Sequence, residues 1–282
     1  MGSNAMSSRW KTVLLLMALL LCGNSGCAAG QQEASDLETS VCGFLREPLA
    51  FWFFRQAAGV ADARRIAGIQ AIERLAFRTR DGRTLGGYKL RSPAAQGYLL
   101  VAQGNAMLAD QIVGALQFFR ERGLDVYVYD YRGYGLSQGN SRLKAIIADY
   151  RDIIAALNAQ GYPQHFLYGM SLGGIILLNA IAGNDDYHAV VIDSSPSRIS
   201  PLGCPEYYDP VNNLPPDCSR IRFIAGERDR VVRLADMEEL LSTAQHRGAQ
   251  VLIQREFAHP FQDASEEIHR RRFEAVANFL TP

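Results

Sequence analysis

The chain has 282 residues, of which 48% are hydrophobic, and it carries 29 basic and 29 acidic residues. This length and apolar content suit one large domain or two small ones with a substantial core. The charge balance argues against a nucleic-acid partner, because proteins that bind nucleic acids usually carry a basic excess on one face. We therefore expect a globular domain whose chemistry resides in particular residues.

The first part of the chain has the pattern of a processing signal. Residues 1–5 are typical of a cloning remnant, and residues 6–29 combine basic residues, an apolar run and small residues, as in a secretory signal peptide. The apolar run is too short to span a membrane as a helix. The tetrapeptide Asn-Ser-Gly-Cys ending at Cys27 resembles a bacterial lipobox, so we predict lipid attachment at Cys27 and a periplasmic or outer-membrane lipoprotein. Ordinary cleavage near Ala29, giving a soluble periplasmic or secreted protein, is the alternative.

Residues 30–43 are polar and acidic, and we predict a tether there, followed by a single domain over residues 44–282. Two cysteines, Cys204 and Cys218, bracket a proline-rich loop, and we predict a disulfide between them in an oxidising compartment. Cys42 would then be free. The alternative is that both loop cysteines are unpaired, because sequence does not determine pairing.

Four consecutive aromatic residues occupy positions 51–54. Such a cluster is rare on a surface unless it is functional. We therefore expect the segment 44–55 to be an extra helix packed on the core. An amphipathic helix on a membrane surface and a lid over the active site are the alternatives.

The remaining chain alternates apolar strands with helices. Residues 72–77 and 84–90 form a predicted hairpin with a turn at Asp81-Gly82. Further strands are predicted at 98–102, 125–131, 166–168, 189–193, 221–225 and 250–255, and helices at 110–122, 143–160, 172–182, 234–245 and 265–280. Continuous apolar strands that alternate with helices indicate a mostly parallel, eight-stranded α/β sheet with helices on both faces.

The pentapeptide Gly-Met-Ser-Leu-Gly at 169–173 lies between a predicted strand and a predicted helix. A serine between two glycines at such a turn is the arrangement of a nucleophile elbow. The turn is so sharp that a Cβ two residues to either side would strike the neighbouring strand or helix. A Gly-x-Ser-x-Gly pattern alone arises by chance, so its position between strand and helix carries the inference.

Sites in open α/β sheets form beyond the carboxyl ends of the strands. Of the five histidines, only His259 follows a predicted strand. We predict Ser171 as nucleophile, His259 as its base and Asp229 as the carboxylate that orients the base. Glu227 and Asp193 also follow strands and compete for the acidic role.

A tetrahedral intermediate needs two backbone N–H donors for its oxyanion, and Leu172, which opens the predicted helix, supplies one. Three segments now resemble the α/β-hydrolase superfamily: Gln-Gly-Asn-Ala at 103–106, Tyr-Asp-Tyr-Arg-Gly-Tyr-Gly-Leu-Ser at 129–137, and the pentapeptide with Gly174. More narrowly they are similar to its His-Gly-Asn-Ala branch of serine hydrolases and depalmitoylating thioesterases.

This resemblance covers residues 72–281 and departs from the branch at Gln103, where His is usual. It implies the α/β-hydrolase fold, Asn105 as the second oxyanion donor, and a supporting role for the loop 130–137. Only residues 194–219 are available for a cap, so we expect a minimal one over an open site. The predicted substrate-binding residues are Gly104, Ala106, Met170, Tyr207 and Tyr208.

These features predict an exported serine hydrolase that cleaves a small-molecule acyl ester or thioester through an acyl-Ser171 intermediate. We expect no metal and no organic cofactor, because the chain has no His-Glu-x-x-His, phosphate-binding loop or dinucleotide fingerprint. One alternative is a serine peptidase or aminopeptidase of the same fold, since the fold does not choose between esters and amides. A non-catalytic binding protein of the cell envelope with this fold is the other.

Overall fold

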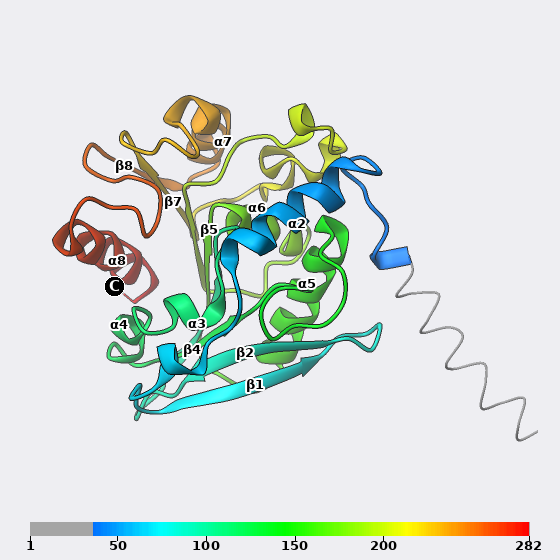
Figure 1. The fold of residues 1–282 in the computed structure, drawn as a ribbon. Coiled ribbons are helices and arrows are strands. Elements are labelled where there is room, and N and C mark those ends of the chain that lie inside the picture. The colour runs from blue at the N-terminus through cyan, green and yellow to red at the C-terminus, as the bar shows by residue number, and fades with distance from the viewer. Residues whose placement is uncertain (1–35, 282) are drawn as a thin grey trace, which may run out of the picture.

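The computed structural model describes residues 36–281, and within them eight strands form one sheet in the order β1-β2-β4-β3-β5-β6-β7-β8 (Figure 1). The pairs β1–β2 and β2–β4 are antiparallel, and the other five pairs are parallel. The predicted mostly parallel, eight-stranded sheet is thus confirmed. The strands are β1 (Ile72–Arg78), β2 (Thr84–Leu90), β3 (Gly97–Ala102), β4 (Leu124–Tyr129), β5 (His165–Met170), β6 (Ala189–Asp193), β7 (Ile221–Gly226) and β8 (Gln250–Gln254).

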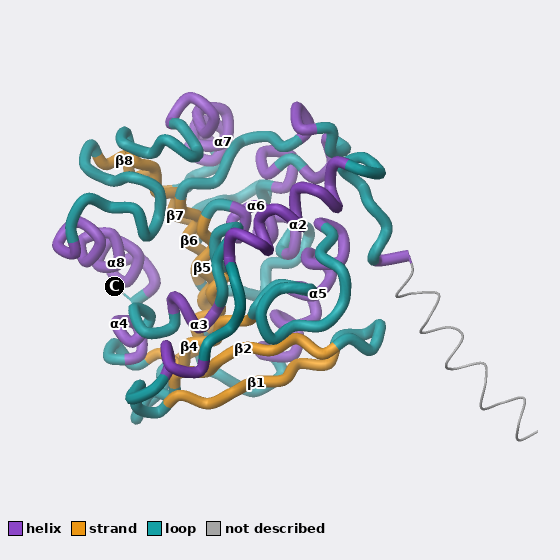
Figure 2. Tube along the Cα trace, in the orientation of Figure 1, coloured by secondary structure: helices purple, strands orange, loops and turns teal. Residues whose placement is uncertain are grey.

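Helices cover both faces of the sheet (Figures 1 and 2). In β3, Leu99 and Val101 belong to the core beneath one set of helices, whereas Leu100 and Ala102 belong to the core beneath the other. Strand side chains alternate between faces, so a strand covered on both sides must be apolar throughout. The first set is α3 (Ala109–Ile112), α4 (Gln117–Arg120) and α8 (Glu266–Leu280); the second is α5 (Leu143–Asn158), α6 (Leu172–Ala180) and α7 (Leu234–His246).

The predicted helix over residues 110–122 is the main departure in secondary structure. It is two short helices, α3 and α4, joined by turns. Gly114 lies in the interruption, and glycine is among the least favourable residues in a helix. Most other predicted elements begin and end within a few residues of the observed ones.

The predicted tether at 30–43 is wrong over the part that is described, residues 36–43. Glu38 forms ion pairs with Arg83 and with the fully buried Arg132. Arg132 also pairs with Asp81 and Asp149, so the first described residues complete a buried charge cluster. A buried cation needs such partners, which is why this segment packs on the domain. The domain therefore begins before residue 44. The predicted cloning remnant, signal peptide and Cys27 lie outside the described residues.

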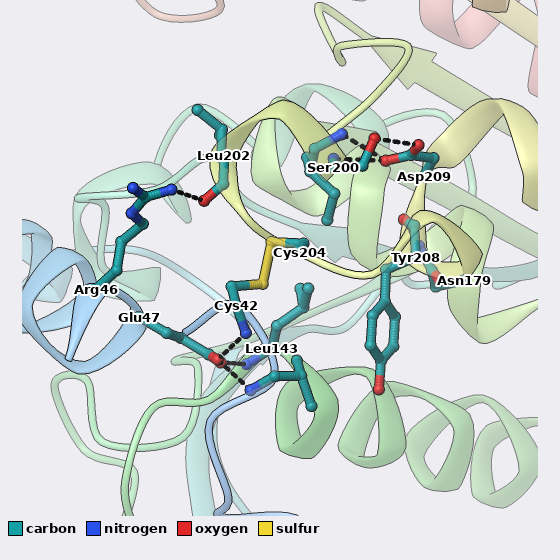
Figure 3. The surroundings of a disulfide bond; sticks show 12 residues. Cys42, Arg46, Glu47, Leu143, Asn179, Ser200, Leu202, Cys204, Tyr208 and Asp209 are labelled. Carbon is teal, nitrogen blue, oxygen red and sulfur yellow. Dashed lines mark hydrogen bonds between the residues drawn. A yellow bond between two sulfur atoms is a disulfide. The ribbon is translucent and has the colours of Figure 1, made fainter. Parts of the chain in front are cut away.

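The predicted disulfide between Cys204 and Cys218 is wrong. Cys204 instead forms its disulfide with Cys42 (Figure 3). Cys218 is a buried free thiol whose Sγ donates to the Pro215 carbonyl. Its backbone N–H donates to the Arg247 carbonyl, which holds it beside the start of β7. Cys42 reaches Cys204 because the N-terminal segment folds back onto the loop after β6, a contact between residues 162 positions apart.

The helix α2 (Arg46–Ala58) connects this disulfide with α3. At its start Arg46 donates to the Leu202 carbonyl, and Glu47 accepts backbone N–H bonds from Cys42 and Leu143 (Figure 3). At its end the Ala58 carbonyl accepts from Gln111 of α3. The predicted cap region 194–219 contains only three short 3-10 helices, at Ser200–Leu202, Glu206–Tyr208 and Pro210–Asn213. Helix α2 therefore adds an N-terminal element to this small cap.

Candidate active site

Ser171 sits at a sharp turn between β5 and α6, with φ 53° and ψ −116°. Positive φ is strained for any residue with a side chain, and such strain concentrates at functional sites. A Cβ on Gly169 would lie 2.7 Å from the Gly173 carbonyl oxygen, and one on Gly173 would overlap the Ala102 carbonyl. The steric reason predicted for both glycines is thus confirmed, and the Ser171 N–H is fixed by a 2.8 Å bond to the Asp193 carbonyl.

His259 lies in the loop after β8 and Asp229 in the loop after β7. The Nδ1 atom of His259 is 2.8 Å from Oδ2 of Asp229, while Oδ1 accepts the backbone N–H groups of Val231 and Val232 at 2.8 and 2.9 Å. Burial raises the pKa of Asp229, but the hydrogen bond with His259 and these two N–H groups outweigh it and hold the pKa below its usual range. An ionised Asp229 accepts a hydrogen bond from the N–H at Nδ1, and this tautomer leaves Nε2 unprotonated and free to act as a base.

The two competing carboxylates have other environments. Glu227 is exposed. Asp193 is fully buried, but its Oδ1 accepts from Arg272 at 2.7 Å and its Oδ2 accepts from the Tyr168 hydroxyl at 3.0 Å. Only Asp229 therefore contacts His259 among the three candidates.

Sequence analysis missed Arg272, which supports the His259 loop from α8. Its side chain is fully buried and donates to both oxygens of Asp263, to the carbonyl of Ala258, and to Asp193. Asp263 in turn accepts the Ala258 N–H at 2.9 Å. Both backbone polar groups of the residue before His259 are therefore fixed. The sequence does contain a signal for this role, because Arg272 interrupts the apolar stripe of α8 next to Phe273. A cation at such a buried position is tolerated only when it is paired.

The loop 103–106 lies against Ser171. A Cβ built on Gly104 would be 3.7 Å from the Ser171 Cβ. The Asn105 side-chain oxygen accepts from the Ala106 N–H at 3.0 Å and from the Tyr134 hydroxyl at 2.8 Å. This side chain is thus occupied, and any oxyanion contact from Asn105 must come from its backbone N–H. Leu172 is the first residue of α6, so its N–H has no acceptor within the helix.

The loop 130–137 braces the loop 103–106, in the supporting position that the resemblance implies. The Tyr131 hydroxyl donates to the Gln103 carbonyl, alongside the Tyr134 bond to Asn105. Asp130 accepts two backbone N–H groups, from Ala109 and Leu136, and burial raises its pKa. The side chain of Gln103 is fully buried, and neither of its amide atoms has a hydrogen-bond partner within residues 36–281.

The predicted substrate contacts divide into two groups. Gly104 and Ala106 belong to the loop that contacts Ser171. Met170 is fully buried in the core under α3, α4 and α8, so its side chain is not available to a substrate. The Tyr208 carbonyl accepts from Asn179 near the far end of α6, about 12 Å along the helix from Ser171.

Tyr207 is exposed and packs against Tyr208, with ring centroids 4.4 Å apart. The buried side chain of Met170 is therefore unavailable to a substrate, whereas substrate binding by Tyr207 and Tyr208 stays a prediction. The position of Met170 in the sequence does not show that its side chain points into the core.

Comparison with known proteins gives a match to a family model described as serine aminopeptidase, S33, over residues 93–214. This match includes Ser171 and the loop 103–106 but ends before Asp229 and His259. An uncharacterized protein YfhR of Escherichia coli K12 is 26% identical over 238 residues, which cover 74% of this chain and 82% of the relative. The α/β-hydrolase domain-containing protein 17C of Xenopus tropicalis is 25% identical over 221 residues, covering 74% and 68%.

Solved structures show the same fold. The esterase Pf2001 of Pyrococcus furiosus superposes with a TM-score of 0.59 at 16% identity, covering 74% of this chain and 91% of that one. The protein XC6422 of Xanthomonas campestris, a serine hydrolase without a lid, has a TM-score of 0.61 at 19% identity, covering 76% and 97%. Together with the sheet order, these similarities show that the chain has the α/β-hydrolase fold.

Proposed function

We propose that the protein is an exported serine hydrolase that cleaves an acyl ester or thioester through an acyl-Ser171 intermediate. The observation that carries this proposal is the 2.8 Å contact between His259 and a buried, ionised Asp229, on the sheet edge where Ser171 sits in a strained turn. A serine hydroxyl is a poor nucleophile near neutral pH, so a paired imidazole with a free Nε2 is what it requires.

In the first half-reaction, Ser171 Oγ attacks the substrate carbonyl carbon while its proton passes to Nε2 of His259. The imidazolium that forms is stabilised by Asp229, and the N–H groups of Leu172 and Asn105 receive the oxyanion. The carbon–oxygen or carbon–sulfur bond then breaks, and His259 returns its proton to the departing alcohol or thiol. In the second half-reaction a water repeats the attack on the acyl-enzyme, and the carboxylic acid is released.

Ester or thioester cleavage is favoured by the small cap. The three 3-10 helices of residues 200–213 and the helix α2 are the additions near this edge of the sheet, which supports an open site for extended acyl substrates. The similar structures include an esterase and a serine hydrolase without a lid. Within this class, the Gln-Gly-Asn-Ala loop supports the depalmitoylase-like branch, with a fatty acyl thioester as substrate.

Export is supported by the leader-like residues 6–29 and by the Cys42–Cys204 disulfide, since such bonds persist mainly in oxidising compartments. Lipidation at Cys27 is tested by labelling cells with a clickable palmitate. Label that is absent, or that survives Cys27→Ala, contradicts the lipoprotein and leaves a soluble periplasmic or secreted protein.

A serine aminopeptidase is the second candidate, favoured by the description of the matching family model. The assay that separates the two compares p-nitrophenyl acyl esters with aminoacyl anilides. Turnover of the esters, abolished in Ser171→Ala, supports the proposal. Turnover of the anilides alone assigns a peptidase, and inertness to both substrates and to a fluorophosphonate probe assigns a non-catalytic binding protein.

A further inference from the structure

Helix α2 packs on the domain with one face and exposes large apolar side chains on the other. Its inward face buries Phe51 and Ala58. On the outward face Leu49, Trp52 and Phe53 remain 61%, 54% and 62% exposed. The patch continues through Phe44 and Leu45 before the helix begins. We call the five exposed residues the aromatic face. A contiguous exposed apolar patch of this kind marks an interaction site.

A groove of about 360 Å³ runs beside the aromatic face, between α2 and the segment 140–142. Its walls include Leu49 and Trp52, and it also contains two cations, Arg55 and Arg142. Neither arginine forms an ion pair with any residue from 36 to 281. The Nε of Arg142 is buried and has no acceptor within the same residues.

The carboxylate nearest this groove in sequence is already engaged. Glu47 accepts the backbone N–H groups of Val41 and Cys42 through one oxygen and that of Leu143 through the other. The groove therefore offers two guanidinium groups beside apolar and aromatic side chains. That combination complements an amphiphile with an anionic head and an apolar tail.

We propose that the aromatic face docks on the surface of a bilayer that contains anionic phospholipid. Trp52, Phe53 and Leu49 would lie at the boundary between headgroups and acyl chains, which aromatic residues favour, while Arg55 and Arg142 bind lipid phosphates. With 13 residues, α2 is about 20 Å long, shorter than the ~30 Å hydrocarbon core. Among the described residues no helix has the length and hydropathy to cross a bilayer, so α2 lies in the plane of the surface.

A second copy of the chain fits this face less well. In a two-fold contact the same patch meets itself, so Arg55 and Arg142 of each copy would approach the like charges of the other. The bilayer also agrees with the chain leading to α2. Cys27, the predicted lipid attachment site, precedes Phe44 by fewer than twenty residues, and stable membrane attachment usually needs a second signal beside one lipid.

The chain offers a direct probe of this contact, because it contains only two tryptophans, Trp10 and Trp52. In the full-length Trp10→Phe, Cys27→Ala protein, Trp52 is the sole tryptophan and no lipid is attached at Cys27. We expect vesicles of equal phosphatidylcholine and phosphatidylglycerol to shift its emission to the blue. Brominated acyl chains in the same vesicles should quench it. Pure phosphatidylcholine vesicles should bind more weakly, and added salt should reduce the difference.

Variants of this protein distinguish membrane binding by the aromatic face from nonspecific hydrophobic adsorption to vesicles. Phe53→Ser with Leu49→Ser should weaken partitioning by about tenfold or more, and Arg55→Gln with Arg142→Gln by roughly fivefold per charge at low salt. The matched control is Ile253→Ser with Val231→Ser, two exposed apolar residues at the β7–β8 end of the sheet, which should leave partitioning unchanged. Thermal melts by circular dichroism verify that each variant is folded.

Two results would overturn the proposal. One is Trp52 emission that does not respond to vesicles, even if the protein sediments with them through its leader. The other is a blue shift that grows with protein concentration in the absence of lipid, which would assign the face to a second copy. Neither readout depends on hydrolysis, so the docking surface can fail while the proposed activity of Ser171 stands.

Discussion

Asp193 is the last residue of β6, and Asp229 follows the neighbouring parallel strand β7. Both are buried, yet their partners differ. Asp193 accepts from Arg272, a permanent cation, and from the Tyr168 hydroxyl. Asp229 accepts from two backbone N–H groups and from His259, a side chain that can gain and lose a proton. A carboxylate held by a permanent cation can only support structure, whereas one that holds an imidazole can serve proton transfer.

Asp193 also supports both Ser171 and the loop that carries His259. The backbone carbonyl of Asp193 holds the Ser171 N–H, and its side chain holds Arg272, which fixes the residue before His259. Asp193 therefore connects the turn at Ser171 with the loop that carries His259. Substituting each aspartate by itself should therefore distinguish a loss of catalytic rate, expected at Asp229, from a loss of stability, expected at Asp193.

The largest expected effect is that of Asp229→Asn on catalysis. The amide retains shape but favours the wrong imidazole tautomer, so kcat for a p-nitrophenyl ester should fall by a factor on the order of 10⁴. Glu227→Gln, an exposed neighbour, is the control and should retain full activity. Near-normal turnover in Asp229→Asn would transfer the acidic role to another carboxylate.

Asp193→Asn should act on stability instead. It removes one of the two carboxylates that contact Arg272, while Asp263 remains as the other, and weakening a buried hydrogen bond to a charged group costs about 3 kcal/mol. Urea denaturation followed by circular dichroism measures this loss. At temperatures where the variant is folded, kcat should stay within about tenfold of the wild type. A stable Asp193→Asn protein that has lost turnover would contradict the division of roles.

The Cys42–Cys204 disulfide allows a further test of stability, because it ties the N-terminal segment to the small cap. Cys204→Ser removes the bond to Cys42 and should lower the free energy of unfolding by about 2 to 4 kcal/mol. Cys218→Ser keeps the bond and is the matched control. A reducing agent should bring the wild type to the Cys204→Ser value. Equal stability of the two variants would argue that Cys42 and Cys204 are unpaired in solution.

The smallest expected effect is a change in acid stability through Asp263. Burial raises the pKa of Asp263, but its bonds from Arg272 and the Ala258 N–H outweigh it and hold the pKa well below the usual range. Because this pKa is lower in the folded state, the stability it contributes is complete above the usual Asp pKa of about 4 and is lost as pH falls below it.

The free energy of unfolding should accordingly decline less steeply with acid in Asp263→Asn than in the wild type. Urea titrations between neutral pH and pH ~3 measure the difference. Glu256→Gln, which alters a surface ion pair with Arg271, should change the slope little. Parallel curves for wild type and Asp263→Asn would show that Asp263 is not preferentially ionised in the folded state.

The fold could be predicted because its signals are local. Strands such as β3 are apolar throughout, and turn residues such as Gly82 mark the hairpin. Ser171 and His259 were also within reach, since both lie just beyond strands at the same edge of a parallel sheet. The resemblance at residues 103–106 and 129–137 then predicts the α/β-hydrolase fold, which the structure has.

The remaining features depend on contacts between distant parts of the chain. Asp193 and Asp229 are equivalent by position, and only the partners Arg272 and His259 distinguish them. The polar composition of residues 30–43 predicts a tether that includes Cys42, yet Glu38 in that segment forms an ion pair with buried Arg132. Pairing across such distances leaves no periodic signal in a single sequence.

The central claim is that Ser171 is activated by His259 held by Asp229, and it is tested most directly by the rate of fluorophosphonate labelling. Mass spectrometry of peptides should place the adduct on Ser171 in the wild type. We predict that Asp229→Asn reacts more slowly by roughly a thousandfold or more, while folded Asp193→Asn reacts at nearly the wild-type rate. Rapid labelling of Asp229→Asn, or an adduct on a residue other than Ser171, would contradict the account.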